Sequence, residues 1–289
     1  MNVSSISKLI PDISVSIVLA SIVLLFVWFI LSVRNNDNTN SDHVKVLFTQ
    51  PPADEDCPIC FLRLPTLRTG HRYMSCCGKV ICSGCYYAPL YDNQGNEVDD
   101  EKCPFCRTPF PSSEDIVEIV ERLTKRIEVK DPIAIYDLGC CYRNGIHGFT
   151  QDYAKALELF HQAGELGHTI AHCNIGYAYE VGQGVEVDLK KANHYYELSA
   201  IGGCALARYN LGNMEVETGD MYRALMHFMI AAESGDNDSL KEIQDLYSDG
   251  YATKAVYMEA LRAYQAYLRE IKSVQRDKAA AADEGNRYF

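Results

Sequence analysis

The residues with the clearest chemical potential are cysteines, which gather in one short stretch of this 289-residue chain. Eight of the twelve fall within fifty residues, and six of those eight stand in Cys-x-x-Cys pairs. A thiol pair at that spacing chelates a metal ion with little loss of loop entropy, and structural zinc takes four thiolate or imidazole ligands. The sequence therefore predicts two zinc sites as its cofactors, held by Cys57, Cys60, Cys76, Cys77, Cys82, Cys85, Cys103 and Cys106.

A zinc site closed by four protein ligands has no open position for water or substrate, so we expect these metals to be structural. We find neither a phosphate-binding Gly-rich loop with a lysine nor a candidate catalytic triad in the sequence. No catalytic residue of this chain is therefore predicted.

Three cysteine-bearing segments closely resemble the RING finger family over about fifty residues. They are Cys57-Pro-Ile-Cys60, Cys77-Gly-Lys-Val-Ile-Cys82-Ser-Gly-Cys85 and Cys103-Pro-Phe-Cys106-Arg107. The resemblance implies a cross-braced fold in which alternate ligand pairs share an ion. One site would use Cys57, Cys60, Cys82 and Cys85, and the other Cys76, Cys77, Cys103 and Cys106.

One position departs from the family pattern. Many RING fingers place a ligand histidine shortly after the third cysteine, where this chain has Lys79. An all-cysteine variant is the main interpretation, with the adjacent Cys76 and Cys77 on one ion. The alternative is that His71 replaces one of them, because zinc accepts either ligand type.

The family resemblance also implies an activity, that of a ubiquitin ligase. Such a finger docks a conjugating enzyme that carries ubiquitin, and catalysis is a matter of positioning. By resemblance Ile59 and Pro104 would form the apolar docking surface, and Arg107 would contact enzyme and ubiquitin together. Two alternatives stay open: these apolar residues pack around zinc, or the finger belongs to a non-enzymatic adaptor or scaffold.

The net charge of -12 argues against binding to nucleic-acid backbones, which requires clustered lysine and arginine. Protein partners are expected instead: the charged conjugating enzyme, and a substrate or adaptor.

An apolar segment precedes the cysteines. Residues 13–33 contain no charge, and a helix of that length covers a hydrocarbon core of roughly 30 Å. We predict a single-pass membrane protein, with residues 1–12 as an N-terminal tail and residues 34–55 as a polar linker. Because free thiols keep zinc in a reducing compartment, the part after the span is expected in the cytosol.

A helical repeat follows the cysteines. An alanine is followed four residues later by an aromatic at Ala156/Phe160, Ala192/Tyr196, Ala224/Phe228 and Ala260/Tyr264, with steps of 36, 32 and 36 residues. Leu138-Gly139, Ile175-Gly176 and Leu211-Gly212 mark partner helices, and Gly167, Gly203 and Gly235 end the paired ones. The pattern predicts a solenoid of about four helix pairs.

Segments of the second repeat, Tyr179-x-x-Gly-x-Gly-Val185, Asp188-x-x-Lys-Ala192 and Tyr195-Tyr196, resemble the Sel-one-like repeat, a relative of the tetratricopeptide class. The resemblance implies a scaffold for protein partners. It weakens in the fourth repeat, where Gln244 replaces the helix glycine.

The other four cysteines, Cys140, Cys141, Cys173 and Cys204, are interpreted as small core residues of these helices. A third metal site at His168, His172 and Cys173 is the alternative, because the two histidines stand four residues apart.

The predicted fold is therefore mainly α, with a single transmembrane helix, a small cross-braced two-zinc RING finger and an α-solenoid. We place the finger at 56–110, a connecting helix at 111–130, the repeats at 131–272 and a C-terminal tail at 273–289. The tail is expected to fray from Asp277.

Overall fold

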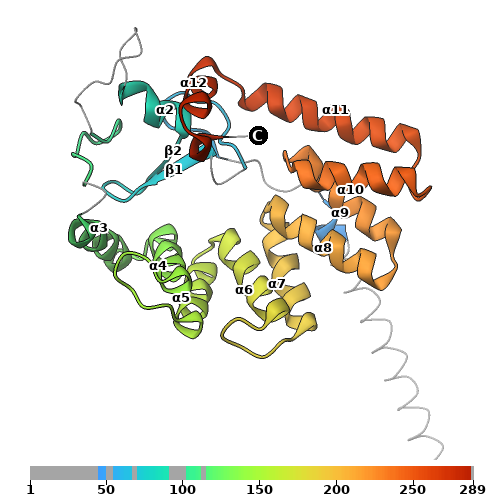
Figure 1. Ribbon diagram of the computed structural model, residues 1–289, viewed down its shortest axis with the longest axis horizontal. Coiled ribbons are helices and arrows are strands. Elements are labelled where there is room, and N and C mark those ends of the chain that lie inside the picture. The colour runs from blue at the N-terminus through green and yellow to red at the C-terminus, as the bar shows by residue number, and fades with distance from the viewer. Residues whose placement is uncertain (1–44, 50–54, 67–69, 91–101, 112–114, 288–289) are drawn as a thin grey trace, which may run out of the picture. The chain divides into compact units, whose positions relative to one another are not determined.

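The computed structural model of the chain describes residues 45–49, 55–66, 70–90, 102–111 and 115–287. The chain divides into two units, residues 1–49 and residues 50–289. All the elements named below belong to the second unit (Figure 1).

The cysteine-rich module comprises the described residues between 55 and 111. Strands β1 (His71–Met74) and β2 (Lys79–Cys82) form an antiparallel hairpin in which His71 faces Cys82 and Met74 faces Lys79. Helix α2 (Ser83–Tyr87) follows β2 directly, and the short 3-10 helix η3 (Ala88–Leu90) extends it. The buried side chains of Leu64, Met74 and Ile81 pack with the cysteines, so this module has little core besides its thiols.

Helices follow one another through the rest of the chain. They are α3 (Ile116–Glu128), α4 (Pro132–Asn144), α5 (Tyr153–Glu165), α6 (Thr169–Val181), α7 (Leu189–Ile201), α8 (Ala205–Thr218), α9 (Met221–Glu233), α10 (Asn237–Ser248), α11 (Lys254–Ile271) and α12 (Val274–Ala282). Helices α4 to α9 pack as three consecutive pairs, and α10 and α11 pack against α9 and against each other. The predicted mainly α solenoid is therefore confirmed.

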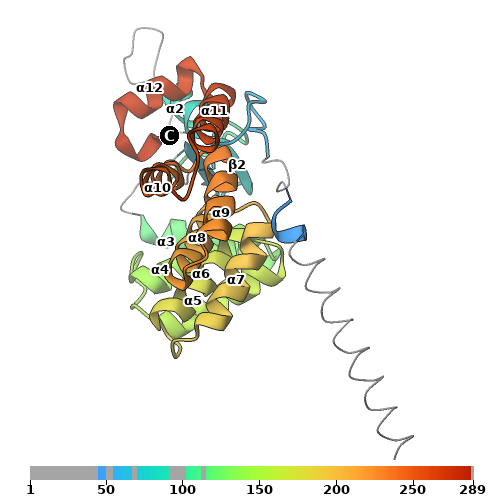
Figure 2. The same ribbon diagram turned by 90° about the vertical axis from the view of Figure 1, so that its right-hand side faces the viewer.

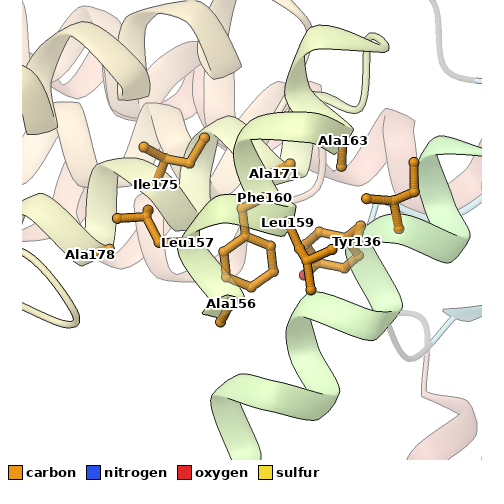
Figure 3. Close-up of a cluster of buried hydrophobic side chains, with 10 residues drawn as sticks. Tyr136, Ala156, Leu157, Leu159, Phe160, Ala163, Ala171, Ile175 and Ala178 are labelled. Atoms are coloured by element: carbon orange, nitrogen blue, oxygen red, sulfur yellow. The ribbon is translucent and has the colours of Figure 1, made fainter. Parts of the chain in front are cut away.

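The glycines in the first helices of the first three pairs have a specific packing role. A Cβ atom at Gly176 would lie 2.7 Å from the Tyr196 ring, and one at Gly212 would lie 2.3 Å from the Phe228 ring. The aromatic ring of the second helix thus rests directly on the backbone of the first. Figure 3 shows the buried cluster of the first repeats, where Phe160 lies among side chains from α4, α5 and α6.

The C-terminal segment differs from the expectation of a frayed tail. Ser273 accepts a hydrogen bond from the Arg276 N–H and so caps α12, which packs against α2 of the cysteine-rich module. Both ribbon views show α12 beside α2 (Figure 1, Figure 2). Tertiary contacts order these residues, an effect that local sequence does not reveal.

The predicted localisation, a single-pass membrane protein, is corrected. In the part of the chain that the structure describes, no helix is long and apolar enough to cross a bilayer. The longest of them, α11, has 18 residues and carries Lys254, Glu259, Arg262, Arg269 and Glu270. The segment 13–33 that carried the prediction lies outside the described residues, and a membrane localisation is not supported.

Candidate metal centre

The eight cysteines of the module meet in two groups of four. One holds Cys57, Cys60, Cys82 and Cys85, and the other Cys76, Cys77, Cys103 and Cys106, with the sulfurs of each group within 4.8 Å of one another. Cysteines from distant segments thus alternate between the groups, as the RING resemblance implied. All eight are free thiols.

The sulfur spacing fits a tetrahedral metal. With metal–sulfur bonds of about 2.3 Å, a tetrahedron places its sulfurs about 3.8 Å apart. The measured separations are 3.7 Å for Cys60 to Cys82, 3.9 Å for Cys77 to Cys103 and 3.4 Å for Cys76 to Cys106. Each group can therefore hold one zinc-sized ion without rearrangement of its loops.

The first and last cysteine pairs lie in two loops of the same design. In one, the Phe61 N–H donates to the Cys57 carbonyl at 2.8 Å, and in the other the Arg107 N–H donates to the Cys103 carbonyl at 2.9 Å. Phe61 and Arg107 both adopt a left-handed backbone, with φ of 58° and 62°. This turn directs both sulfurs of a Cys-x-x-Cys pair toward one point.

The hairpin and α2 supply the remaining ligands. Cys76 and Cys77 lie in the turn between β1 and β2, where Gly78 has a φ of 69° and the Gly78 N–H donates to the Met74 carbonyl. Cys82 ends β2 and caps α2, since its sulfur accepts the Cys85 N–H at 3.4 Å.

Four crowded thiols cannot all ionise without a cation. Hydrogen bonds from the Cys82 and Cys85 thiols lower the pKa of Cys57, whereas contacts with Cys57 and Cys82 raise the pKa of Cys85. Burial raises the pKa of Cys77 to about 11. A divalent ion resolves this conflict because it binds every sulfur as the thiolate.

His71, the alternative ligand, and Lys79, which stands where the family pattern has a histidine, both contact other residues. His71 Nδ1 lies 3.1 Å from the Pro65 carbonyl oxygen, and the second sulfur group includes Cys76 and Cys77 but not His71. Lys79 places its ammonium 5.7 Å from the centre of the Phe105 ring. Lys79 thus packs on the last Cys-x-x-Cys loop.

The residues expected to dock a partner lie on the same two loops. Ile59 is 36% exposed and its neighbour Phe61 76%, and Phe105 beside Pro104 is also exposed. Pro104 itself is half-buried, and Arg107 is exposed. The module therefore presents apolar side chains to solvent although its own core is small.

The third metal site weighed at His168, His172 and Cys173 is not formed. Among the described residues, only the two cysteine groups bring three or more such ligands together. The His168 ring packs 4.5 Å from the Tyr136 ring, and the His172 ring 6.2 Å from that of Tyr195. Cys141 and Cys173 are buried and Cys140 and Cys204 half-buried, which fits core packing.

Sequence reasoning missed the residues that fasten the module to the helices. Tyr73 and Arg126 both donate to the Asp131 carboxylate, and Arg276 reaches the first sulfur group from α12. The only local signal was Asp131 before Pro132, which marked a helix start and not a contact with β1.

The fold and the site together define a helical-repeat protein with a compact module able to bind metal. The repeats match the Sel1 repeat model at residues 132–168, 169–204 and 205–236, which are the pairs α4–α5, α6–α7 and α8–α9. The chain therefore contains three Sel1 repeats, and the pair α10–α11 follows them outside the match. Repeats of this kind form a scaffold for protein–protein interaction.

Known proteins resemble parts of the chain. It is 42% identical over 55 residues to E3 ubiquitin-protein ligase DA2 of Arabidopsis thaliana, which is 19% of this chain and 12% of that protein. It is 40% identical over 55 residues to E3 ubiquitin-protein ligase GW2 of Oryza sativa subsp. indica, 19% of this chain and 11% of that protein. A putative sel1-like repeat-containing protein of Acanthamoeba polyphaga mimivirus is 31% identical over 94 residues, 32% of this chain and 16% of its own. The chain thus spans less than a fifth of each relative.

Among solved structures, the Sel1 repeat protein from Oxalobacter formigenes superposes with a TM-score of 0.46 at 27% identity, over 59% of this chain and 66% of the other. The assignment of the repeats rests on the family match and on the helix pairs.

Proposed function

We propose that the chain is a RING-type ubiquitin ligase. In this proposal residues 56–110 form the finger, 111–130 the connecting helix and 131–272 the substrate-selecting repeats. Two structural zinc ions hold the finger, and Ile59, Pro104 and Arg107 meet a conjugating enzyme that carries ubiquitin.

One observation carries the proposal, the alternation of the cysteine pairs between two groups of four sulfurs. Such interleaving ties two loops of the same design into one rigid body, which is what a docking platform requires. The two ligase-named relatives support it with short regions of 42% and 40% identity.

In the proposed mechanism the finger positions its partners and the conjugating enzyme supplies the reactive group. The zinc ions, when bound, supply structural rigidity. The described residues of the finger need supply no nucleophile, because the reactive thioester arrives on the conjugating enzyme. Apolar loop residues bury surface against that enzyme, and the Arg107 guanidinium, with several fixed donors, can bridge carbonyl groups of two partners. Holding two reactants in a near-attack arrangement lowers a barrier by several kcal/mol, about 7 in favourable cases.

The repeats supply selection. Sel1 repeats mediate protein interaction, and their fixed connection to the finger through α3 holds a bound protein near the charged enzyme. Such confinement raises effective concentration without any new contact.

The test is single-turnover discharge of ubiquitin from a panel of charged conjugating enzymes to free lysine, with the zinc-loaded full chain. We expect stimulation by at least one enzyme and its loss in Ile59→Ala. Ile146→Ala, which truncates an exposed isoleucine outside the finger, is the matched control. No stimulation with any enzyme, despite two zinc ions per chain, would leave the adaptor as the function.

A further inference from the structure

Arg276 of α12 is the largest charged side chain brought to the first sulfur group, and it is fully buried, with 0% of its surface exposed. Helix α12 comes close enough for this because Gly84 of α2 faces it. A Cβ atom at Gly84 would lie 2.7 Å from the Arg276 backbone nitrogen. The contact between α2 and α12 thus requires glycine at that position.

The Arg276 guanidinium lies between the end of α11 and the first Cys-x-x-Cys loop. Nη1 donates to the Ile271 carbonyl at 2.6 Å, and Nη2 lies 3.4 Å from the Leu62 carbonyl oxygen and 4.0 Å from the Cys60 sulfur. Leu62 and Cys60 belong to the first Cys-x-x-Cys loop. Arg276 therefore joins the end of α11 to the loop that holds half of the first site.

A buried guanidinium needs a compensating negative charge, because arginine does not lose its proton in proteins. Among the described residues no carboxylate forms an ion pair with Arg276, and the oxygens that it contacts are the neutral carbonyls of Ile271 and Leu62. Arg126 gives the contrast. It lies against Gly78 beside the second site, but its charge is balanced by Asp131. The sulfurs of the first site are therefore the negative groups that can balance the charge of Arg276.

Four thiolates around one zinc ion carry two net negative charges, which nearby donors stabilise. We propose that Arg276 is an outer-shell group of the first zinc site, a positioning residue that balances its charge and makes its metal affinity depend on the docking of α12. This inference rests on the proposed zinc sites. It gives the C-terminal segment a role at the metal centre, although Arg276 lies 170 residues after Cys106, the last of the eight cysteines.

Helix α12 brings Arg276 to the first site without covering the proposed docking loops. With α12 in place, Ile59, Phe61 and Phe105 all remain exposed. The same contact region is reinforced by Tyr267, whose hydroxyl accepts the Thr66 N–H at 2.7 Å, and by the ion pair of Arg63 with Glu270. The C-terminal helices therefore support the first site while the side chains of its proposed partner surface stay exposed.

The test compares the full chain with Arg276→Met, which keeps an unbranched apolar stem and removes the charge, and with Arg276→Lys, which keeps the charge. Arg269→Met, an exposed arginine on α11, is the matched control. Zinc per chain and the rate of zinc transfer to a chromophoric chelator are measured, and far-UV circular dichroism follows the helices. We expect one of two ions to leave Arg276→Met about 10- to 100-fold faster, as for other outer-shell substitutions, with Arg276→Lys between it and the parent chain.

Equal release rates in Arg276→Met and the parent chain would overturn the inference. So would equal acceleration of both ions, because that outcome indicates a general loss of stability. If Arg276→Met does not fold, the graded release from Arg276→Lys decides between the same outcomes. Failure of the parent chain to hold two zinc ions is a different result, since it removes the proposed function itself.

Discussion

The hydroxyl of Tyr73, on strand β1 of the cysteine-rich module, donates a hydrogen bond of 2.8 Å to the Asp131 carboxylate at the start of the repeats. The same carboxylate accepts from Arg126 at 2.6 Å and from the Ile133 N–H at 3.1 Å, so it also caps α4. Although burial opposes it, hydrogen bonding from Arg126 and Tyr73 lowers the pKa of Asp131. One buried carboxylate thus fixes the module, the connecting helix and the first repeat to one another.

Asp131→Ala is expected to lower the free energy of unfolding by about 3 kcal/mol, because it removes a helix cap and leaves the part-buried donors Tyr73 and Arg126 without their acceptor. Tyr73→Phe should cost about 1 kcal/mol, since one hydrogen bond is lost. The measurement is denaturant unfolding followed by circular dichroism. Asp152→Ala removes an exposed cap of α5 and should cost only about 1 kcal/mol. Equal effects of Asp131→Ala and Asp152→Ala would contradict a linking role.

Gly176→Ala should be destabilising although alanine normally favours a helix. The added methyl would lie 2.7 Å from the Tyr196 ring, and such overpacking costs about 1–3 kcal/mol. Tyr196→Leu in the same chain should reverse part of the loss, because it removes the clash. A thermal midpoint for Gly176→Ala at or above that of the parent chain would show that the helix pair is looser than described.

Cys76→Ser is expected to lower bound zinc from two ions to one per chain, whereas His71→Ala should retain both. The reason is that the second sulfur group includes Cys76 and excludes His71. Elemental analysis after gel filtration measures the metal. Cys140→Ser serves as a control outside both groups, and loss of zinc from His71→Ala would reinstate the histidine as a ligand.

Arg107→Asn tests the positioning role with little backbone strain, because asparagine tolerates the left-handed conformation at a φ of 62°. We expect full zinc content and ubiquitin discharge slower by about tenfold, since contact to both partners would be lost. Discharge at the parent rate would remove Arg107 from the mechanism. Arg262→Asn, an exposed arginine on α11, is the control.

The burial of His227 predicts that the folding stability of the repeats depends on pH. Burial, reinforced by the positive charges of Arg208 and Arg223, lowers the pKa of His227 from 6.5 to about 3. Between these values the unfolded chain binds a proton that the folded chain excludes, so stability falls as the pH is lowered through that window. The slope approaches about 1.4 kcal/mol per pH unit. Unfolding measured between pH 7 and 5 should show this slope, His227→Gln should flatten it, and the exposed His194→Gln should not.

Much of this organisation was readable from local pattern. The steps between the alanine–aromatic pairs predicted helix pairs because a ring and a small residue four apart share one helix face. Cysteine spacing predicted two metal sites because chelation by Cys-x-x-Cys depends on only four residues. Asp131-Pro132 predicted the start of α4, which begins at Pro132.

Long-range docking was decided only by the tertiary structure. The four consecutive alanines and the charged residues that follow Asp277 favoured a frayed tail, because the sequence alone does not show what this segment contacts. The burial of Arg276 depends on the path of the helix pairs, because it contacts Cys60, 216 residues away in the sequence, and Gly84 of α2, 192 residues away. Helix starts and Cys-x-x-Cys pairs can be predicted from the sequence because they depend on residues a few positions apart. The contact of Arg276 with the first metal site could not be predicted, because it joins residues far apart in the sequence that only the folded chain brings together.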